Sequence, residues 1–135
     1  MLTNAIMVLL LGVFAAIVAF LVNKRNSDSP SVPRNSLPIQ IDRSDFENPK
    51  TEWILILFSS DSCDSCQEVR NLIKGLTLDS FHIQEVEFPQ ETPTHQRYGI
   101  DSVPITLVAG TDGVVVWSYA GVPTADLLSN MVSSL

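Results

Sequence analysis

The chain has 135 residues, 45% of them hydrophobic and 17% charged, with a formal net charge of −7. This length leaves room for one packed domain and accessory segments. Nucleic-acid binding requires clustered Lys and Arg, which the strongly acidic part beyond residue 50 lacks, so no nucleic-acid partner is expected. Five of the eight basic residues lie before that point: Lys24, Arg25, Arg34, Arg43 and Lys50.

The N-terminal segment predicts a membrane anchor. From Ala5 to Val22 the sequence is uncharged and apolar, just long enough to cross a bilayer. No basic residue precedes this run and no A-x-A site follows it, which argues against a cleaved signal peptide. A buried core helix is the alternative, but the run is apolar all round and adjoins a polar segment. We predict a single-pass transmembrane helix over residues 1–22, in the plasma membrane.

Two features follow the predicted anchor. Lys24 and Arg25 come directly after it, and the positive-inside rule favours a cytoplasmic location for the rest of the chain, with an extracytoplasmic one as the alternative. Residues 23–50 contain many Asn, Ser and Pro and predict a flexible linker. Within it, weak alternation at Ile39-Gln40-Ile41 is compatible with a short edge strand.

Residues 51–135 are predicted to form the folded domain. Apolar runs and alternating segments indicate strands, helical spacing of apolar residues indicates helices, and Asp112-Gly113 predicts a hairpin turn. The predicted strands are 53–59, 82–88, 105–109 and 114–119, and the predicted helices are 63–75, 92–98 and 124–132. The order β-α-β-α-β-β-α combines a parallel crossover with a terminal hairpin, so the fold class is α/β with helices on the faces of one sheet.

The chain has only two cysteines, Cys63 and Cys66, and they open the first predicted helix of this domain. Unpaired backbone N–H groups at a helix start favour the thiolate form of Cys63. Cys66 lies one turn later, within reach to close a disulfide. A C-x-x-C pair between a strand and a helix indicates a redox motif, and a closed zinc site would need more ligands than the pair provides, so no metal is expected.

Together these features resemble the thioredoxin-like family over residues 52–135. The apolar strand leads into Cys63-Asp64-Ser65-Cys66, and the segment 98–104, ending in Val103-Pro104, is similar to the one that carries the family's cis-proline. The hairpin and the final amphipathic helix follow in the family's order. The resemblance implies a thioredoxin fold, with a central mixed sheet flanked by helices. The anchor and spacer also resemble those of membrane-tethered bacterial members.

The resemblance also implies roles for individual residues. Cys63 would be the attacking thiol and Cys66 the resolving thiol of a redox-active disulfide, with no other cofactor. Pro104 would be cis and would present the Val103 backbone to an extended substrate. The implied partners are protein or small thiol and disulfide substrates and an electron-donor reductase, in a role in cell redox homeostasis.

This sequence departs from well-known members near the cysteines. Leu57 stands where thioredoxins carry a buried Asp that is thought to shuttle a proton. Glu85 on the next strand is a candidate for that task, and a solvated strand charge is the alternative. Asp61 and Asp64 flank Cys63 and oppose its ionisation, which favours the disulfide form and hence a reductant.

The sequence therefore predicts an enzyme, a membrane-tethered thiol–disulfide oxidoreductase that reduces protein disulfides through Cys63 and Cys66. Two alternatives remain open at this point. One is a thioredoxin-fold module that binds or delivers a metal through the two thiolates. The other is a redox-inactive interaction domain held at a membrane.

Overall fold

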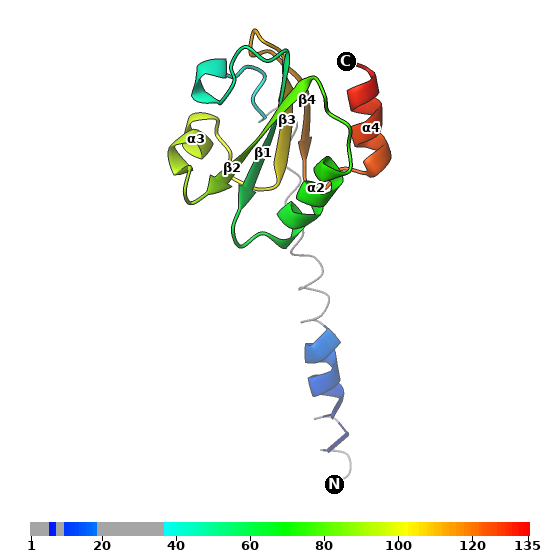
Figure 1. The fold of residues 1–135 in the computed structure, drawn as a ribbon. Coiled ribbons are helices and arrows are strands. Elements are labelled where there is room, and N and C mark those ends of the chain that lie inside the picture. Colours follow the sequence, from blue (N-terminus) through cyan, green and yellow to red (C-terminus); the bar gives the residue numbers. More distant parts are fainter. Residues whose placement is uncertain (1–5, 8–9, 19–36) are drawn as a thin grey trace. The chain divides into compact units, whose positions relative to one another are not determined.

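The computed structural model describes residues 6–7, 10–18 and 37–135 (Figure 1). The chain divides into two units, residues 1–30 and 31–135. In the first unit the described residues are helical, with exposed apolar side chains. Among the described residues, no helix combines the length and the hydropathy that crossing a membrane requires. Residues 1–5, 8–9 and 19–22 of the predicted span lie outside those ranges.

The second unit is built on a four-stranded sheet with the strand order β2-β1-β3-β4 (Figure 1). The two central strands are β1 (Trp53–Ser60) and β3 (Ile105–Ala109), and the outer strands are β2 (Phe81–Phe88) and β4 (Val115–Ala120). β1 runs parallel to β2, whereas β3 is antiparallel to both β1 and β4. The central strands are buried along nearly their whole length, as expected for strands covered on both faces.

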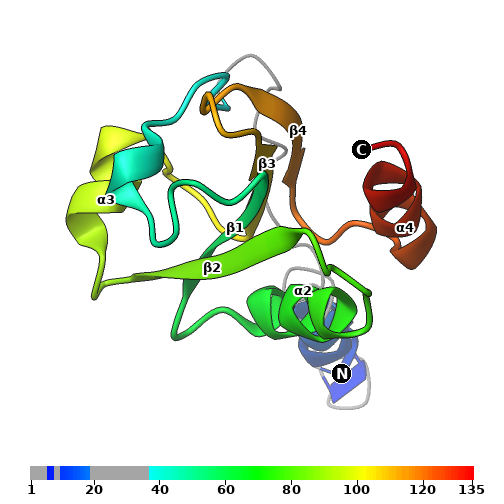
Figure 2. The same ribbon diagram turned by 45° about the horizontal axis from the view of Figure 1, so that its top comes forward.

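Helices cover both faces of the sheet (Figure 2). α2 (Asp64–Lys74) and α4 (Ala125–Ser133) lie on one face, where Val69 and Leu128 pack with Leu55 and Leu57 of β1. α3 (Thr92–Arg97) and the short 3-10 helix η2 (Arg43–Asp45) lie on the other, where the alternate β1 residues point. This alternation along β1 divides the core into two layers.

The predicted domain boundary at residue 51 is too late. Residues 23–36 of the predicted linker lie outside the described residues, but Leu37, Ile41 and Phe46 are buried in the core. Gln40 forms a β-bridge with Val114, in place of the short edge strand considered at residues 39–41. The few apolar residues of this irregular segment follow no regular period, so local pattern suggested a linker.

The predicted strands and helices otherwise agree with the observed ones to within two residues at each end. Gly113 and Gly121 both have positive φ, as the turn after Asp112 and the break after β4 require. The predicted α/β class with a mixed sheet is confirmed.

Candidate active site

The cysteine pair lies where β1 passes into α2. A short turn follows Ser60, closed by a hydrogen bond from the Cys63 N–H to the Ser60 carbonyl oxygen (3.3 Å). The Asp61 N–H donates to the Phe88 carbonyl oxygen (3.3 Å), which ties this turn to the end of β2. Cys63 has extended backbone angles and is the N-cap of α2. The turn therefore holds the first sulfur at the start of the helix, as predicted.

Cys63 and Cys66 form a disulfide, with a Cα–Cα distance of 5.3 Å. Cys66 is fully buried against the sheet, while Cys63 is half-buried and reaches the surface. The Cys63 sulfur accepts a hydrogen bond from the Cys66 N–H (3.2 Å). The structure thus distinguishes one accessible sulfur, held by a backbone donor, from one sulfur enclosed by the fold.

Serine hydroxyls surround the pair. The Ser65 Oγ lies 3.6 Å from the Cys63 Sγ. Ser60 and Ser62 bond to each other instead, with their hydroxyl oxygens 3.2 Å apart. Asp61 and Asp64 are exposed on either side of Cys63. The surface around the accessible sulfur is therefore polar, and the charged residues nearest to it in sequence are acidic.

Val103 and Pro104 lie at the same end of the sheet as the cysteines. Phe58 pairs with Ile105 in the antiparallel register of β1 and β3, so the residues after Phe58 and before Ile105 leave the sheet together. The Val103–Pro104 peptide is cis, which confirms that part of the prediction. Pro104 is buried and its carbonyl oxygen accepts a hydrogen bond from the Gly121 N–H (2.9 Å). A role in substrate binding stays a prediction.

Solved thioredoxin structures superimpose on this arrangement. A mutant thioredoxin from Halobacterium salinarum matches with a TM-score of 0.59 at 20% identity, covering 73% of this chain and 88% of that chain. The germline-specific thioredoxin Deadhead from Drosophila melanogaster matches with a TM-score of 0.58 at 20% identity, covering 68% and 89%. Thioredoxin from Fasciola hepatica gives 0.56 at 17% identity, covering 64% and 83%. The chain has the thioredoxin fold.

No protein-family model matches the chain, and a comparison with curated proteins finds no match either. The sequence identities of 17–20% establish the thioredoxin fold alone.

The thioredoxin fold of this chain carries an ion pair next to the buried cysteine. Leu57 is buried beneath α2, and its neighbour across the parallel register is Glu85. Glu85 Oε1 accepts hydrogen bonds from Arg70 Nε (2.7 Å) and from the hydroxyl of the fully buried Ser59 (2.5 Å). Arg70 is four residues after Cys66, so the pair fastens α2 to β2 one turn beyond the disulfide.

Glu85 is held as a carboxylate. Burial disfavours its charged form, but the hydrogen bonds from Arg70 and Ser59 and the charges of Arg70 and Lys74 outweigh burial and lower its pKa. A carboxylate with a lowered pKa is a poor proton donor near neutral pH. Glu85 thus forms an ion pair that connects β2 to α2. This differs from both hypotheses for Glu85, a solvated charge on the strand and a group ready to transfer protons.

Two side chains of this cluster, Ser59 and Arg70, were not singled out from the sequence. Ser59 could be noticed only as a polar residue at the end of an apolar strand. Arg70 could be noticed only as a basic residue four positions after Cys66, on the same side of the predicted helix. Thr106 was missed as well: its hydroxyl is buried without a hydrogen-bond partner, opposite Leu57 in the β1–β3 register. Each of these roles depends on pairing between distant elements.

His95 and the two tryptophans have structural roles. His95 is buried, with Nε2 3.0 Å from the Val86 carbonyl oxygen, and its ring meets the edge of Phe58. Trp53 packs in the core and Trp117 stacks on Tyr119 at a centroid distance of 6.0 Å. Within the described ranges, no three His, Cys, Asp or Glu side chains form a group that fits a metal ion.

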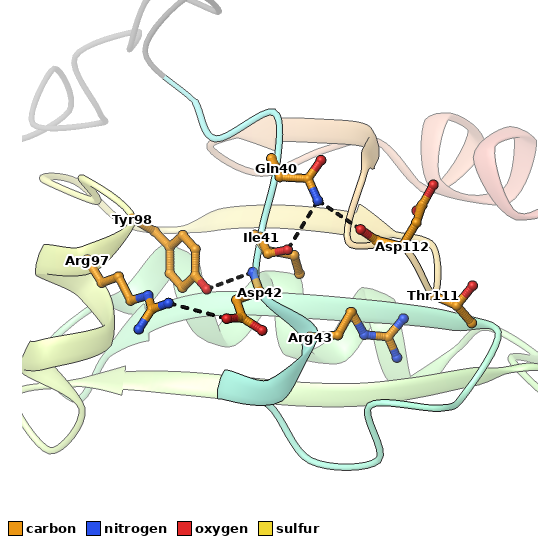
Figure 3. A pocket seen from close by; sticks show the side chains of 8 residues that line it. All are labelled: Gln40, Ile41, Asp42, Arg43, Arg97, Tyr98, Thr111 and Asp112. Carbon is orange, nitrogen blue, oxygen red and sulfur yellow. Dashed lines mark hydrogen bonds and ion pairs between the residues drawn. The ribbon is translucent and has the colours of Figure 1, made fainter.

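A separate hollow of about 640 Å³ lies between residues 40–43, the end of α3 and the β3–β4 hairpin (Figure 3). In it, Arg97 pairs with Asp42 (3.5 Å), and the Tyr98 hydroxyl accepts from the Asp42 N–H (3.0 Å). The hairpin is at the opposite end of β3 from Pro104. This hollow therefore does not belong to the disulfide site.

Arg43, which is buried, lines that hollow and connects the segments around it. Its guanidinium donates to the carbonyl oxygens of Gly110 (2.6 Å), Thr51 (2.9 Å) and Asn48 (3.3 Å). Burial lowers the pKa of Arg43, and no carboxylate pairs with it in the region from Leu37 onward. Its observed contacts are those of a structural clamp that holds the segment before β1 to the hairpin.

Proposed function

We propose that this chain is a thiol–disulfide oxidoreductase that acts as a reductant of protein disulfides. The observation that carries the proposal is the Cys63–Cys66 disulfide, with an accessible sulfur at the N-cap of α2 and a buried sulfur one turn later. Its location at the end of the thioredoxin-fold sheet from which Val103 and Pro104 also extend supports the same assignment.

The reaction starts from the reduced pair. The Cys63 thiolate attacks one sulfur of a substrate disulfide, breaks that bond and forms a mixed disulfide, and the first substrate thiolate leaves. The Cys66 thiolate then attacks the Cys63 sulfur, forms the Cys63–Cys66 disulfide and releases the second substrate thiolate. Two electrons pass from the cysteine pair to the substrate, and the protons released by the two cysteines balance those taken up by the two substrate thiols.

Exposure and local dipoles support Cys63 as the attacking group. Its sulfur reaches the surface, and it faces the partial positive charge of a helix start and the Cys66 N–H at 3.2 Å. Cys66 is enclosed, and the sulfur that it attacks is that of Cys63, with which it forms the disulfide. The pair then needs an electron-donor reductase to return to the dithiol state.

Insulin reduction by the full-length chain in detergent, with dithiothreitol as electron source, tests the activity. We expect turnover by the wild type, none by Cys63→Ser, and a trapped mixed disulfide at Cys63 in Cys66→Ser. Ser62→Ala is the matched control, because its hydroxyl contacts Ser60 and not a sulfur. Wild-type turnover no faster than that of Cys63→Ser contradicts the proposal and leaves the two non-redox alternatives.

The direction is tested by the reduction potential. We expect a value nearer about −270 mV than the roughly −120 mV of a strong periplasmic oxidant. Equilibration of the full-length chain with glutathione redox buffers, followed by alkylation and mass measurement, gives this value. A potential near that of the oxidant contradicts the reductant assignment while leaving the thiol–disulfide chemistry intact.

We also propose that residues 1–22 anchor the chain in the plasma membrane of a bacterium, on the strength of the apolar run from Ala5 to Val22. Lys24 and Arg25 support a cytoplasmic location for the redox domain. A compartment-specific reporter fused after Leu135, combined with alkaline extraction of membranes, tests both points. Release by alkali contradicts the anchor, and activity of an extracytoplasmic reporter contradicts the orientation.

A further inference from the structure

One side chain reaches the reactive sulfur directly. The Ser65 hydroxyl oxygen lies 3.6 Å from the Cys63 Sγ, and no other hydroxyl group contacts that sulfur in the part of the chain that the structure describes. Because the sulfur is in a disulfide and carries no proton, the serine hydroxyl must be the donor. Ser65 is half-buried within the first turn of α2, which limits the directions its hydroxyl can take.

The contact belongs to a converging pair of donors. The Cys66 N–H approaches the same sulfur at 3.2 Å. The neighbouring serines are turned elsewhere: Ser62 N–H donates to the Ser60 Oγ at 3.3 Å, and the two hydroxyls meet at 3.2 Å. Ser65 is therefore distinguished from the other serines of this loop by its direct contact with the sulfur.

A thiolate accepts hydrogen bonds more strongly than a disulfide sulfur, because it carries a full negative charge. The same contact therefore strengthens when Cys63 is reduced and ionised. The charged residues that flank Cys63 in sequence, Asp61 and Asp64, act in the opposite sense, because carboxylates disfavour a nearby anion. A local donor is what allows this acidic loop to hold a reactive thiolate.

We propose that the Ser65 hydroxyl is the side-chain donor that stabilises the Cys63 thiolate, and that Ser65 is in this sense a catalytic residue. The inference rests on the proposed function, since it concerns the same sulfur. The hydroxyl keeps its proton throughout: it donates a hydrogen bond to Cys63 as nucleophile during substrate reduction, and as leaving group when the disulfide is reduced again.

Alkylation of the reduced, full-length chain tests this proposal without any substrate. Iodoacetamide is applied over a pH series, and modification of Cys63 is followed by mass spectrometry in the wild type, Ser65→Ala, Ser65→Thr and Ser62→Ala. Removal of a hydrogen bond to a charged group predicts that Ser65→Ala alkylates about three- to tenfold more slowly below the titration midpoint. Above the midpoint Ser65→Ala reacts at least as fast as the wild type, because a thiolate of higher pKa is the better nucleophile. Ser65→Thr resembles the wild type, and the profile of Ser62→Ala does not shift.

Two results overturn the proposal. One is a Ser65→Ala profile that coincides with the wild-type profile. The other is a shift that Ser62→Ala reproduces or that Ser65→Thr fails to reverse, since the cause would then be a general change in the loop. If Ser65→Ala is alkylated more slowly as expected but the wild type does not reduce insulin, the proposed function is contradicted and the role of Ser65 is not. Failure of the proposed function can therefore be told apart from failure of this proposal.

Discussion

At the residue scale, the charges closest to Cys63 set the balance between its two oxidation states. Asp61 and Asp64 are exposed on either side of it, and neither forms an ion pair within residues 37–135. Negative charge disfavours the thiolate and so favours the disulfide. The donors from Ser65 and the Cys66 backbone act against this.

Neutralising both carboxylates predicts a weaker reductant. In Asp61→Asn/Asp64→Asn the dithiol form is stabilised, so the reduction potential becomes less negative, by about 30 mV for each tenfold change in the equilibrium constant. Glutathione equilibration measures this shift, which we expect to shrink at about 1 M salt. Glu52→Gln/Asp79→Asn, which removes two exposed carboxylates before β1 and beyond the far end of α2, is the control for net charge. A potential that stays constant or becomes more negative refutes the charge argument.

At the element scale, the contact between α2 and β2 depends on Arg70. Its guanidinium pairs with Glu85 (2.6 Å) and Glu87 (3.3 Å), and Ser59 of β1 joins through its hydroxyl. Three elements thus meet at the Glu85 carboxylate, which accepts hydrogen bonds from Arg70 of α2 and Ser59 of β1. These contacts hold the middle of α2 against β2.

Loss of the Glu85 carboxylate predicts a modest, pH-dependent loss of stability. The lowered pKa of Glu85 means that its contribution is present above the ordinary glutamate range and is lost as pH falls through the lowered value. Because Glu85 is about one-third exposed, screening limits the effect of Glu85→Gln to about 0.5–1 kcal/mol at pH 7. Urea unfolding measures it. We expect the difference to shrink as the pH falls below the ordinary glutamate range, and Glu68→Gln, which removes an exposed carboxylate on α2, to cause no loss of stability.

The same variant tests whether Glu85 carries a proton in the reaction. Since the carboxylate is ionised and committed to Arg70, we expect Glu85→Gln to leave the pH profile of insulin reduction unchanged. Initial rates between about pH 5 and 9 provide the measurement. Loss of one limb of the profile in this variant would restore the proton-carrier hypothesis.

The β3–β4 hairpin provides a second test at this scale. Gly113 has φ +76°, and a Cβ there would collide with the Ile41 carbonyl oxygen of the segment that docks on the hairpin. Gly99 also has positive φ (+64°), but a Cβ at that position would meet no atom within 4 Å. Gly113→Ala should therefore destabilise more than Gly99→Ala, which bears only the backbone strain of about 1–3 kcal/mol. Thermal unfolding compares them, and equal losses would refute close docking.

At the scale of the whole molecule, the fold depends on residues before β1. Leu37, Ile41 and Phe46 belong to the same core layer as Phe58 and Leu107, and Phe46 stacks on Tyr98. Arg43 adds the clamp to Gly110. The sheet and helices between residues 51 and 135 are therefore incomplete by themselves.

Two truncations test this dependence. A fragment of residues 37–135 keeps the segment and should unfold cooperatively in urea, whereas a fragment of residues 51–135 loses three buried apolar side chains and the Arg43 clamp. At about 2–5 kcal/mol for each large core side chain, the three losses together are comparable with the whole stability of a small domain. We expect the shorter fragment to be unfolded, as measured by circular dichroism. A stable shorter fragment would restore the boundary at residue 51.

The sequence was sufficient for elements with a strong local pattern. The apolar run of β1, the Asp112-Gly113 turn and the cysteine pair at a helix start can each be recognised within a few residues. It failed for the segment of residues 37–50, where the apolar contacts bridge distant parts of the chain. The same limit hid the site details: Arg70 needs Glu85 from another strand, and the rotamer of Ser65 decides which sulfur it meets.

The sulfur of Cys63 is also the cap of α2, because it accepts the hydrogen bond from the Cys66 N–H. The negative charge on this cap changes each time the protein passes between its oxidised and reduced forms. The opening of the first helical turn is consequently linked to the redox state, and the amide hydrogen of Cys66 is an internal reporter of it. The rate at which this amide exchanges with deuterium, measured by NMR, reports the redox state without any thiol reagent.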